Sequence, residues 1–338
     1  MTGHRINIGF LTALVLFPAF ACGQIGVTRT WTDAMGNEFV AKLASLDGDS
    51  VLLDVRGQRF PYKIDALSAA DQAYLKELSK PADGKIGEFP IQADEKLTAW
   101  LKENHMRSLQ WKGKPDDWKE EMIMPFQLHV PPEEARKDGE KIPLLLHLHG
   151  TGGIGENNLQ QFGDGGEVAK KFMSKEFQEK QACYIMLPQT PRMSGWYALA
   201  NTDPSSDLKA IVQAIKLLAQ DPDYDVDLSR IYVTGLSMGG AGAFQAMAKF
   251  PGFFAAAAPT SYVDIPGLFH SNNCGPMWIA VNAGDYRYEE DIKEFSDHYL
   301  SVGGKIKTSV FNKKGHDAWT ELYTDKAFRD WLFQQKIE

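Results

Sequence analysis

The chain has 338 residues, enough for about two domains, and 43% of them are hydrophobic while 24% are charged, as in ordinary globular proteins. This composition excludes a chain that is disordered throughout. The 44 acidic residues outnumber the 36 Lys and Arg residues, and the net charge of -8 argues against nucleic acid as a partner. With three cysteines the chain has neither a disulfide framework nor a paired-cysteine zinc site, and we expect no metal. Two of them, Cys183 and Cys274, could pair in an oxidising compartment or remain thiols.

Residues 1–21 have the pattern of a removed export signal. His4 and Arg5 precede an apolar run from Phe10 to Phe20, and Ala19-Phe20-Ala21 supplies the small residues of a cleavage site. The run is too short to span a bilayer, so a membrane anchor is the weaker interpretation. The sequence therefore predicts export to the periplasm or the cell exterior. Lipid attachment at Cys22, the first residue after cleavage, is a less favoured alternative.

Residues 27–80 predict a small β domain. Short alternating runs separated by turn residues are typical of a barrel of four or five strands. Ser68 and Asp71 then predict the start of a helix in a variant of the capping box. The strings WTDAMGNEFVAKL, DGDSVLL, GQRFPY and LSAADQAYL resemble the SH3-like homology module first described in an endocytic adaptor. That resemblance implies a peptide ligand as one role, although a packing or spacing module is favoured here.

Residues 81–95 hold two prolines and no hydrophobic period, which predicts an exposed linker. Residues 96–338 then alternate strands with helices, so we expect an α/β domain with a doubly wound, mostly parallel sheet and helices on both faces. The helix predicted over residues 205–220 carries the apolar stripe of a helix laid against a sheet. The expected strands are MPFQLHV, IPLLLHLHG, CYIMLPQ, RIYVTG, AAAAPTSY, MWIAVNAG and KIKTSVF.

Ser237 lies where a strand gives way to a helix. Gly235-Leu236-Ser237-Met238-Gly239 follows a β-branched run and precedes a helix of small residues. A sharp turn of this kind, a nucleophile elbow, strains the serine backbone and leaves room only for glycine two residues before and after it. The pentapeptide alone is a weak signal, but its placement predicts an exposed nucleophilic hydroxyl at Ser237.

A serine hydroxyl becomes a good nucleophile only when a base takes its proton, and that base needs a carboxylate to orient it. In a fold of this type the base follows the serine along the chain, which leaves His270, His298 and His316. We favour His316 because it lies in the loop after the last predicted strand. The other two histidines are expected to face solvent.

The carboxylate should lie at the C-terminal end of a strand between the serine and the base. Asp285 comes soon after the strand MWIAV and meets this requirement. Asp264 follows the strand AAAAPTSY and is the alternative, because some members of the fold take the acid from one strand earlier. Asp317 adjoins the base and is interpreted as a turn residue. The sequence favours Asp285 and leaves Asp264 open.

The oxyanion that forms on an attacked carbonyl needs two fixed N–H donors. The backbone of Met238, at the start of the helix, is one candidate. The glycine-rich loop after IPLLLHLHG should supply the other, from Thr151 first and Gly152 next. This loop lacks the Lys and the glycine spacing of a phosphate-binding loop, so a nucleotide cofactor is not expected.

Substrate access is predicted to be open. Only about fourteen residues separate the strand AAAAPTSY from the next strand, which is short for a segment that carries a helical lid. An open cleft suits acyl groups carried on a polymer. Trp196, Tyr197 and Trp319 are candidate platforms for such a substrate, with packing in the core as the alternative.

The strings LLLHLHGTGG, DLSRIYVTGLSMGG and GHDAWTELY make residues 126–333 resemble the α/β-hydrolase superfamily. Within it the chain looks most like exported esterases of the polyhydroxybutyrate-depolymerase-like, feruloyl-esterase-like and phospholipase/carboxylesterase-like kinds. The resemblance implies a cofactor-free serine esterase acting on small-molecule or polymer-borne esters, with Ser237, Asp285 and His316 as its catalytic triad. Relatives usually carry His-Gly before the acid, where this chain has Val281-Asn282. Two alternatives remain: a peptidase of the prolyl-oligopeptidase type, and a non-catalytic protein that binds peptides through the small barrel.

Overall fold

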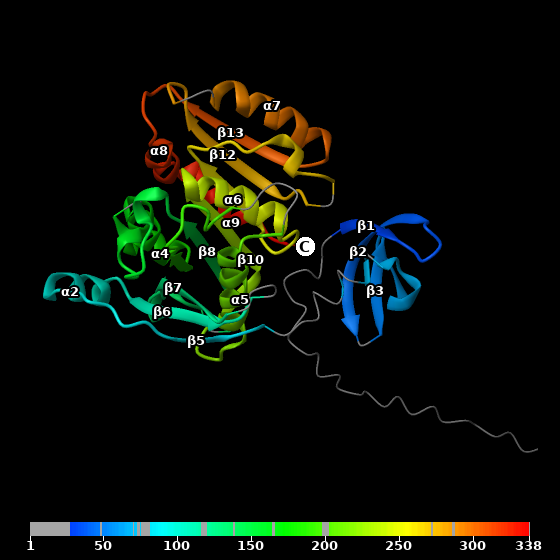
Figure 1. Ribbon diagram of the computed structural model, residues 1–338, viewed down its shortest axis with the longest axis horizontal. Coiled ribbons are helices and arrows are strands. Elements are labelled where there is room, and N and C mark those ends of the chain that lie inside the picture. The colour runs from blue at the N-terminus through cyan, green and yellow to red at the C-terminus, as the bar shows by residue number, and fades with distance from the viewer. Residues whose placement is uncertain are drawn as a thin grey trace, which may run out of the picture.

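The computed structural model describes residues 28–47, 49–69, 71–72, 75, 82–115, 120–137, 139–163, 166–197, 203–271, 273–285 and 288–337. The predicted export signal and Cys22 lie outside these residues. Within them the strands form two sheets, one of four strands and one of nine (Figure 1). No helix in this part of the chain is long and apolar enough to cross a membrane.

The smaller sheet is antiparallel, and its strands lie side by side in chain order. Its side chains alternate, and those of Trp31, Leu43, Val51 and Leu53 are buried together. The predicted number of strands is therefore confirmed, while closure into an SH3-like barrel stays a prediction. The four strands are β1 (Thr28–Thr32), β2 (Glu38–Asp47), β3 (Ser50–Val55) and β4 (Gln58–Lys63).

Ser68 caps the helical turn that follows this sheet, as the sequence predicts. Its Oγ accepts a hydrogen bond from the backbone N–H of Asp71 at 3.2 Å. The Asp71 carboxylate does not close the capping box, because it accepts from the backbone N–H of Thr32 and pairs with Arg29, each at 2.7 Å. Asp71 therefore ties the turn to the first strand.

The larger sheet runs in the order β13-β12-β11-β10-β8-β9-β7-β6-β5. Neighbours from β13 to β9 are parallel, and β7, β6 and β5 join antiparallel at one edge. All seven strands expected from the sequence are present. The nine strands are β5 (Lys85–Glu88), β6 (Met106–Gly113), β7 (Met122–His129), β8 (Ile142–Leu148), β9 (Tyr184–Pro188), β10 (Val226–Leu236), β11 (Ala256–Thr260), β12 (Pro276–Asn282) and β13 (Lys305–Phe311).

The prediction of a linker over residues 81–95 is wrong for residues 85–88. These residues form β5, which pairs antiparallel with β6 and sets Ile86 opposite Trp111. Four residues are too few to show a hydrophobic pattern. The strand forms because it hydrogen-bonds to β6, more than twenty residues along the chain, and the sequence of residues 85–88 does not reveal that partner. The larger domain therefore begins inside the segment that the sequence indicates as a linker.

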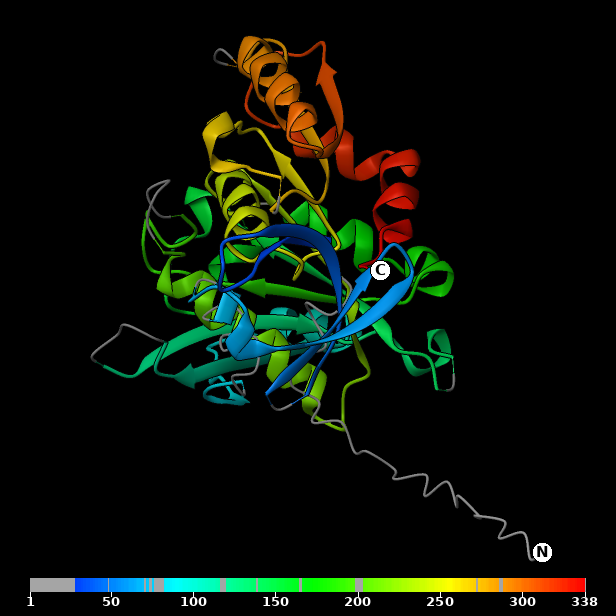
Figure 2. The same ribbon diagram turned by 90° about the vertical axis from the view of Figure 1, so that its right-hand side faces the viewer.

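Helices cover both faces of the larger sheet. Side chains of α5 (Ser206–Gln220), α6 (Met238–Lys249) and α7 (Tyr288–Ser301) join the core on one face. Those of α3 (Gly166–Met173), α4 (Lys175–Lys180), α8 (Ala318–Thr324) and α9 (Lys326–Gln334) join the core on the other. Figure 2 shows α7 in orange and α9 in red on opposite sides of the strands at that end of the sheet. The remaining helix, α2 (Glu95–Glu103), lies between β5 and β6 in the chain.

The sequence of the central strand β8 does not alternate between apolar and polar residues, and the packing of its side chains explains this. Leu144, Leu146 and Leu148 face the core under α5 and α6, while Leu145 faces the opposite core. A parallel strand with helices on both faces is apolar on both sides, so it reads as a continuous hydrophobic run.

Neither cysteine among the described residues forms a disulfide. Cys183 is fully buried, and burial raises the pKa of its thiol to about 12. Cys274 is half-buried, and burial raises the pKa of its thiol to about 11. Both side chains are therefore protonated thiols at neutral pH.

His147 lies in β8, and we expect it to make the folded protein less stable in acid. Burial, with a smaller contribution from His149, lowers the pKa of His147 from 6.5 to about 3. Between these pH values the unfolded chain binds a proton that the folded protein does not. We therefore expect the free energy of unfolding to fall by roughly 1.4 kcal/mol per pH unit from this residue as the pH drops from 6 to 4.

This expectation is checked by urea unfolding of the wild type and of His147→Gln at several pH values. Glutamine does not titrate, so the variant should lose stability less steeply over this range, whatever its stability at pH 7. Equal slopes for the two proteins would show that His147 takes up its proton in the folded state.

Candidate active site

Ser237 sits in the turn between β10, which ends at Leu236, and α6, which begins at Met238. Its φ of 54° and ψ of -117° put it in the strained conformation predicted for a nucleophile elbow. A Cβ on Gly235 would lie 2.2 Å from the carbonyl oxygen of Gly239. A Cβ on Gly239 would lie 2.0 Å from the carbonyl oxygen of Leu148. Helix α6 therefore starts directly against the end of β8, and only glycine fits at these two positions.

His316 joins Ser237 and Asp285 in one chain of hydrogen bonds. Its Nε2 lies 2.8 Å from Ser237 Oγ, and its Nδ1 lies 2.7 Å from Asp285 Oδ2. A carboxylate only accepts, so Nδ1 carries the proton and Nε2 is left to accept from the serine hydroxyl. The Asp285 side chain is 6% exposed and that of His316 is 44% exposed. The acid is therefore shielded, while the base faces solvent.

The pairing of β12 with β13 brings the acid and the base together. It continues past both strands, because the backbone N–H of Ala283 donates to Phe311 O and that of Gly284 donates to Lys313 O, each at 2.9 Å. Gly315 then turns the chain with a φ of 110°, a conformation that favours glycine. Asp285 and His316 thus lie on two loops that leave the sheet side by side.

The other titratable candidates do not reach this chain of hydrogen bonds. Asp264 accepts from the backbone N–H of Ile265 at 2.7 Å and from Gln245 Nε2 at 3.3 Å, and burial raises the pKa of its carboxyl group. His270 is exposed, as predicted. His298, predicted to face solvent, is instead half-buried, with Nε2 at 3.0 Å from the backbone oxygen of Phe269.

Asn282 is a residue whose part in this arrangement the sequence did not indicate. It is fully buried, and its Nδ2 donates to Gly315 O at 3.0 Å and to Asp317 Oδ1 at 2.8 Å, on either side of His316. Asp317, predicted to be a turn residue, is the residue directly before α8. The available signal was an amide at the end of an otherwise apolar strand, three residues before the acid. Such a residue must find hydrogen-bond partners when it is buried.

The two predicted sources of oxyanion donors lie close together. Met238 is the first residue of α6, where a backbone N–H has no partner within the helix. Thr151 and Gly152 lie in a 3-10 turn, η3 (Thr151–Gly153), directly after β8. The position of a Cβ on Gly239 is only 2.8 Å from the carbonyl oxygen of His149, so the start of α6 lies against the chain that leads into this turn.

The three aromatic residues predicted to bind substrate lie in different surroundings. The prediction is wrong for Trp196, which is fully buried and donates from Nε1 to His149 O at 2.9 Å. A Cβ on Gly242 of α6 would lie 2.6 Å from the Trp196 Cβ, so this side chain packs between the helix and the loop after β8. Tyr197 is 43% exposed. Trp319 is half-buried, with its ring 6.1 Å from that of His316 in an edge-on contact.

A mostly parallel sheet with helices on both faces and a serine in a strained turn between strand and helix is the architecture of the α/β hydrolases. The comparisons agree with this class. The chain is similar to the protein named alpha/beta hydrolase psoB of Aspergillus fumigatus, with 24% identity over 269 residues, 73% of this chain and 58% of that protein. It is also similar to a solved thermostable esterase, with 26% identity and a TM-score of 0.57, covering 68% of this chain and 63% of that one.

The chain thus spans less than two thirds of the length of either relative. No protein-family model matches it. The two similarities nevertheless support the α/β-hydrolase fold.

Proposed function

We propose that the protein is a serine hydrolase that cleaves carboxylic esters through an acyl-enzyme, with Ser237, His316 and Asp285 as its catalytic triad. The observation that carries this proposal is the continuous hydrogen-bonded chain from Ser237 Oγ through the His316 ring to the Asp285 carboxylate. The strained backbone of Ser237 supports it further, because such strain persists where a function requires it.

In the proposed reaction, Ser237 Oγ attacks the ester carbonyl carbon while His316 Nε2 takes the hydroxyl proton. The carbonyl oxygen becomes an oxyanion, held by the backbone N–H groups of Met238 and Thr151, or of Gly152. As the carbonyl re-forms, the bond to the alcohol oxygen breaks and His316 returns its proton to the departing alcohol. Water then attacks the acyl-enzyme with His316 again as the base, which releases the acid and restores Ser237. The buried Asp285 carboxylate stabilises the charged imidazole in both halves.

The site also supports a proposal about substrate. The segment between β11 and β12 holds, in its described part, only the 3-10 turn η5 (Pro266–Leu268), which fits the predicted absence of a helical lid. A site without a lid, with His316 exposed to solvent, favours esters on bulky or polymeric carriers. Tyr197 and Trp319 are the remaining candidate platforms for such a carrier. Export and a peptide-binding role for the four-stranded sheet stay proposals from the sequence.

Labelling with a fluorophosphonate tests the proposed function directly. We expect stoichiometric modification of the wild type, located on Ser237 by mass spectrometry of its peptides, and no labelling after denaturation. An aryl acetate should be hydrolysed and a prolyl nitroanilide should not, which separates the esterase from a peptidase. A folded wild-type protein that neither reacts with the probe nor hydrolyses the aryl acetate would contradict a serine esterase and leave the peptide-binding alternative.

A further inference from the structure

Two loops meet beside the proposed site. The first, residues 149–153, carries the candidate oxyanion donors, and the second, residues 189–196, follows β9. The second loop donates three hydrogen bonds to the first: Thr190 N to His149 Nε2 at 3.2 Å, Trp196 Nε1 to His149 O at 2.9 Å and Gln189 Nε2 to Gly153 O at 3.1 Å. The shape of the oxyanion loop thus depends on where the second loop lies.

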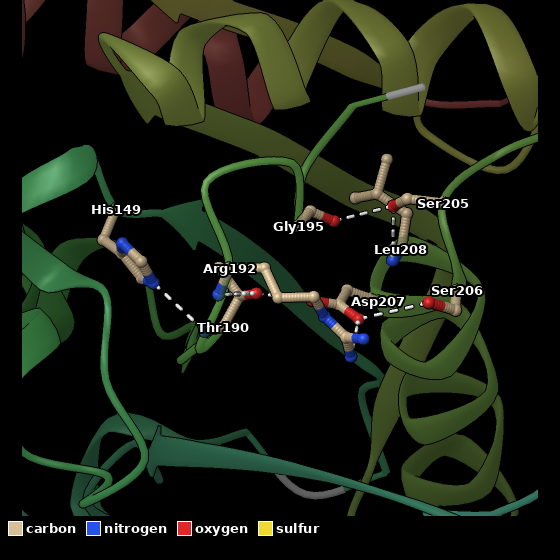
Figure 3. A network of polar contacts seen from close by, with 8 residues as sticks. All are labelled: His149, Thr190, Arg192, Gly195, Ser205, Ser206, Asp207 and Leu208. Carbon is tan, nitrogen blue, oxygen red and sulfur yellow. Dashed lines mark hydrogen bonds and ion pairs between the residues drawn. The ribbon is translucent and has the colours of Figure 1, made fainter. Parts of the chain in front are cut away.

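The side chain of His149 connects the oxyanion loop to the second loop. Its Nδ1 lies 2.6 Å from Gly150 O, and a carbonyl only accepts, so Nδ1 carries the proton. Its Nε2 is then the acceptor for the backbone N–H of Thr190 (Figure 3). The ring lies directly under the loop, since a Cβ on Gly153 would be 2.5 Å from its Cγ. His149 is therefore a neutral spacer that supports the oxyanion loop.

The second loop is in turn fixed to the first turn of α5. Thr190 Oγ1 donates to Asp207 Oδ2, and Arg192 Nη2 donates to Asp207 Oδ1 at 2.9 Å. The backbone N–H of Arg192 also donates to Thr190 Oγ1 at 3.2 Å, and Ser205 Oγ donates to Gly195 O at 2.7 Å (Figure 3). Thr190 is fully buried and Asp207 is 1% exposed.

A carboxylate removed from water in this way is costly to leave without partners. Burial raises the pKa of Asp207, while the hydrogen bond from Thr190 and the charge of Arg192 oppose that rise. Its two oxygens are held by different residues of one loop, so they fix both the position and the orientation of that loop. The hydrogen bonds that Asp207 accepts from Thr190 and Arg192 can therefore fix the second loop relative to α5.

We propose that Thr190, Asp207 and Arg192 are positioning residues that set the oxyanion loop through His149. The inference rests on the proposed function, since it assigns a role to the support of the same site. An oxyanion donor acts only when it lies within about 0.5 Å of the place where the charge develops. Release of Thr190 from Asp207 should therefore weaken transition-state binding and leave ground-state binding of the ester almost unchanged.

Thr190→Val tests this role. Valine has nearly the volume of threonine, but it removes the hydroxyl that donates to Asp207. We expect kcat for an aryl acetate to fall about tenfold to a hundredfold with KM changed less than about threefold. Thr190→Ser keeps the hydroxyl and should retain kcat within about threefold. The amount of folded protein, measured by circular dichroism for each variant, separates this loss of kcat from a loss of folded protein.

A second readout is binding of an aryl boronic acid, which bonds to Ser237 Oγ and places an anionic oxygen where the oxyanion forms. Its affinity for Thr190→Val should fall by about the same factor as kcat. Ser229→Ala is the matched control, because Ser229 Oγ donates to the Asp227 carboxylate at 2.6 Å near the opposite end of β10. This variant should keep wild-type kcat and boronate affinity.

The outcomes separate the inference from the function on which it rests. If Thr190→Val folds but keeps kcat and boronate affinity within about twofold of the wild type, the positioning role is wrong and the proposed function stands. If Thr190→Val does not fold, Arg192→Ala decides, since this side chain is 39% exposed and Asp207 still accepts from Thr190 and Ser206 without it, so its loss should lower kcat in a folded protein. A wild-type protein inert to ester and probe would overturn both proposals.

Discussion

Replacing Ser237 with alanine should lower kcat for an aryl acetate by about 10⁴-fold to 10⁶-fold. Alanine offers no oxygen to the carbonyl carbon, so the acyl-enzyme cannot form. What remains is attack by water with help from His316 and the oxyanion donors, which accounts for residual catalysis in enzymes that lose the nucleophile. Steady-state rates, with mass spectrometry to follow the acyl-enzyme, measure the effect.

The same substitution should leave the fold intact. The Ser237 hydroxyl bonds to His316, whose side chain is 44% exposed, so its removal leaves no buried group without a partner. We therefore expect a melting temperature within a few degrees of the wild type. The variant His316→Ala should lose a similar factor in kcat, and the double variant should lose little more than either, because the two groups act as one unit.

Ser261→Ala is an informative comparison for Ser237→Ala. Ser261 also directly follows a strand and has a positive φ, 50°, but it is fully buried and its Oγ accepts from the backbone N–H of Ala318 at 3.2 Å. Its loss should lower stability and still permit stoichiometric labelling by a fluorophosphonate. Activity in Ser237→Ala above about a tenth of the wild type would mean that another group is the nucleophile.

The sequence predicted the segment around Ser237 well because its signals are local. A β-branched strand, glycines at fixed offsets and a helix of small residues all lie within twenty residues, and each limits the same turn. His316 and Asp285 were assigned from chain order and strand ends. Their contact comes from the register between β12 and β13, which sequence patterns describe only as two separate strands.

The errors lie where a residue's surroundings come from distant parts of the chain. Trp196 was a candidate platform because an aromatic side chain can line an open cleft, with packing in the core as the alternative. It is buried because Gly242 of α6, more than forty residues away, leaves space for it. The strand β5 was missed for the same reason, because its own sequence gives no signal and its hydrogen bonds come from β6. The contacts of Asn282 and Thr190 likewise come from distant parts of the chain, from the loop that carries His316 and from α5.

The largest remaining choice in the site is between Asp285 and Asp264, and their asparagine variants should differ greatly. We expect Asp285→Asn to lower kcat by about 10⁴-fold. The amide would donate to His316 Nδ1, which forces the ring proton onto Nε2, where it blocks acceptance of the proton from Ser237. Asp264→Asn should keep kcat within about threefold, because Asp264 is held by Gln245 and Ile265 on the α6 side of the site.

The reverse result would require the loop that carries His316 to move. Asp264 becomes the partner of His316 only if the imidazole turns away from Asp285, and Asn282 holds the backbone of Gly315 and the side chain of Asp317, the residues on either side of that imidazole. Asn282→Ala therefore completes the experiment. If Asp285 is the acid, loss of the Asn282 amide should loosen His316 and lower kcat. If the loop moves to Asp264 during the reaction, loss of the same amide should raise kcat, because the two hydrogen bonds would then oppose the motion.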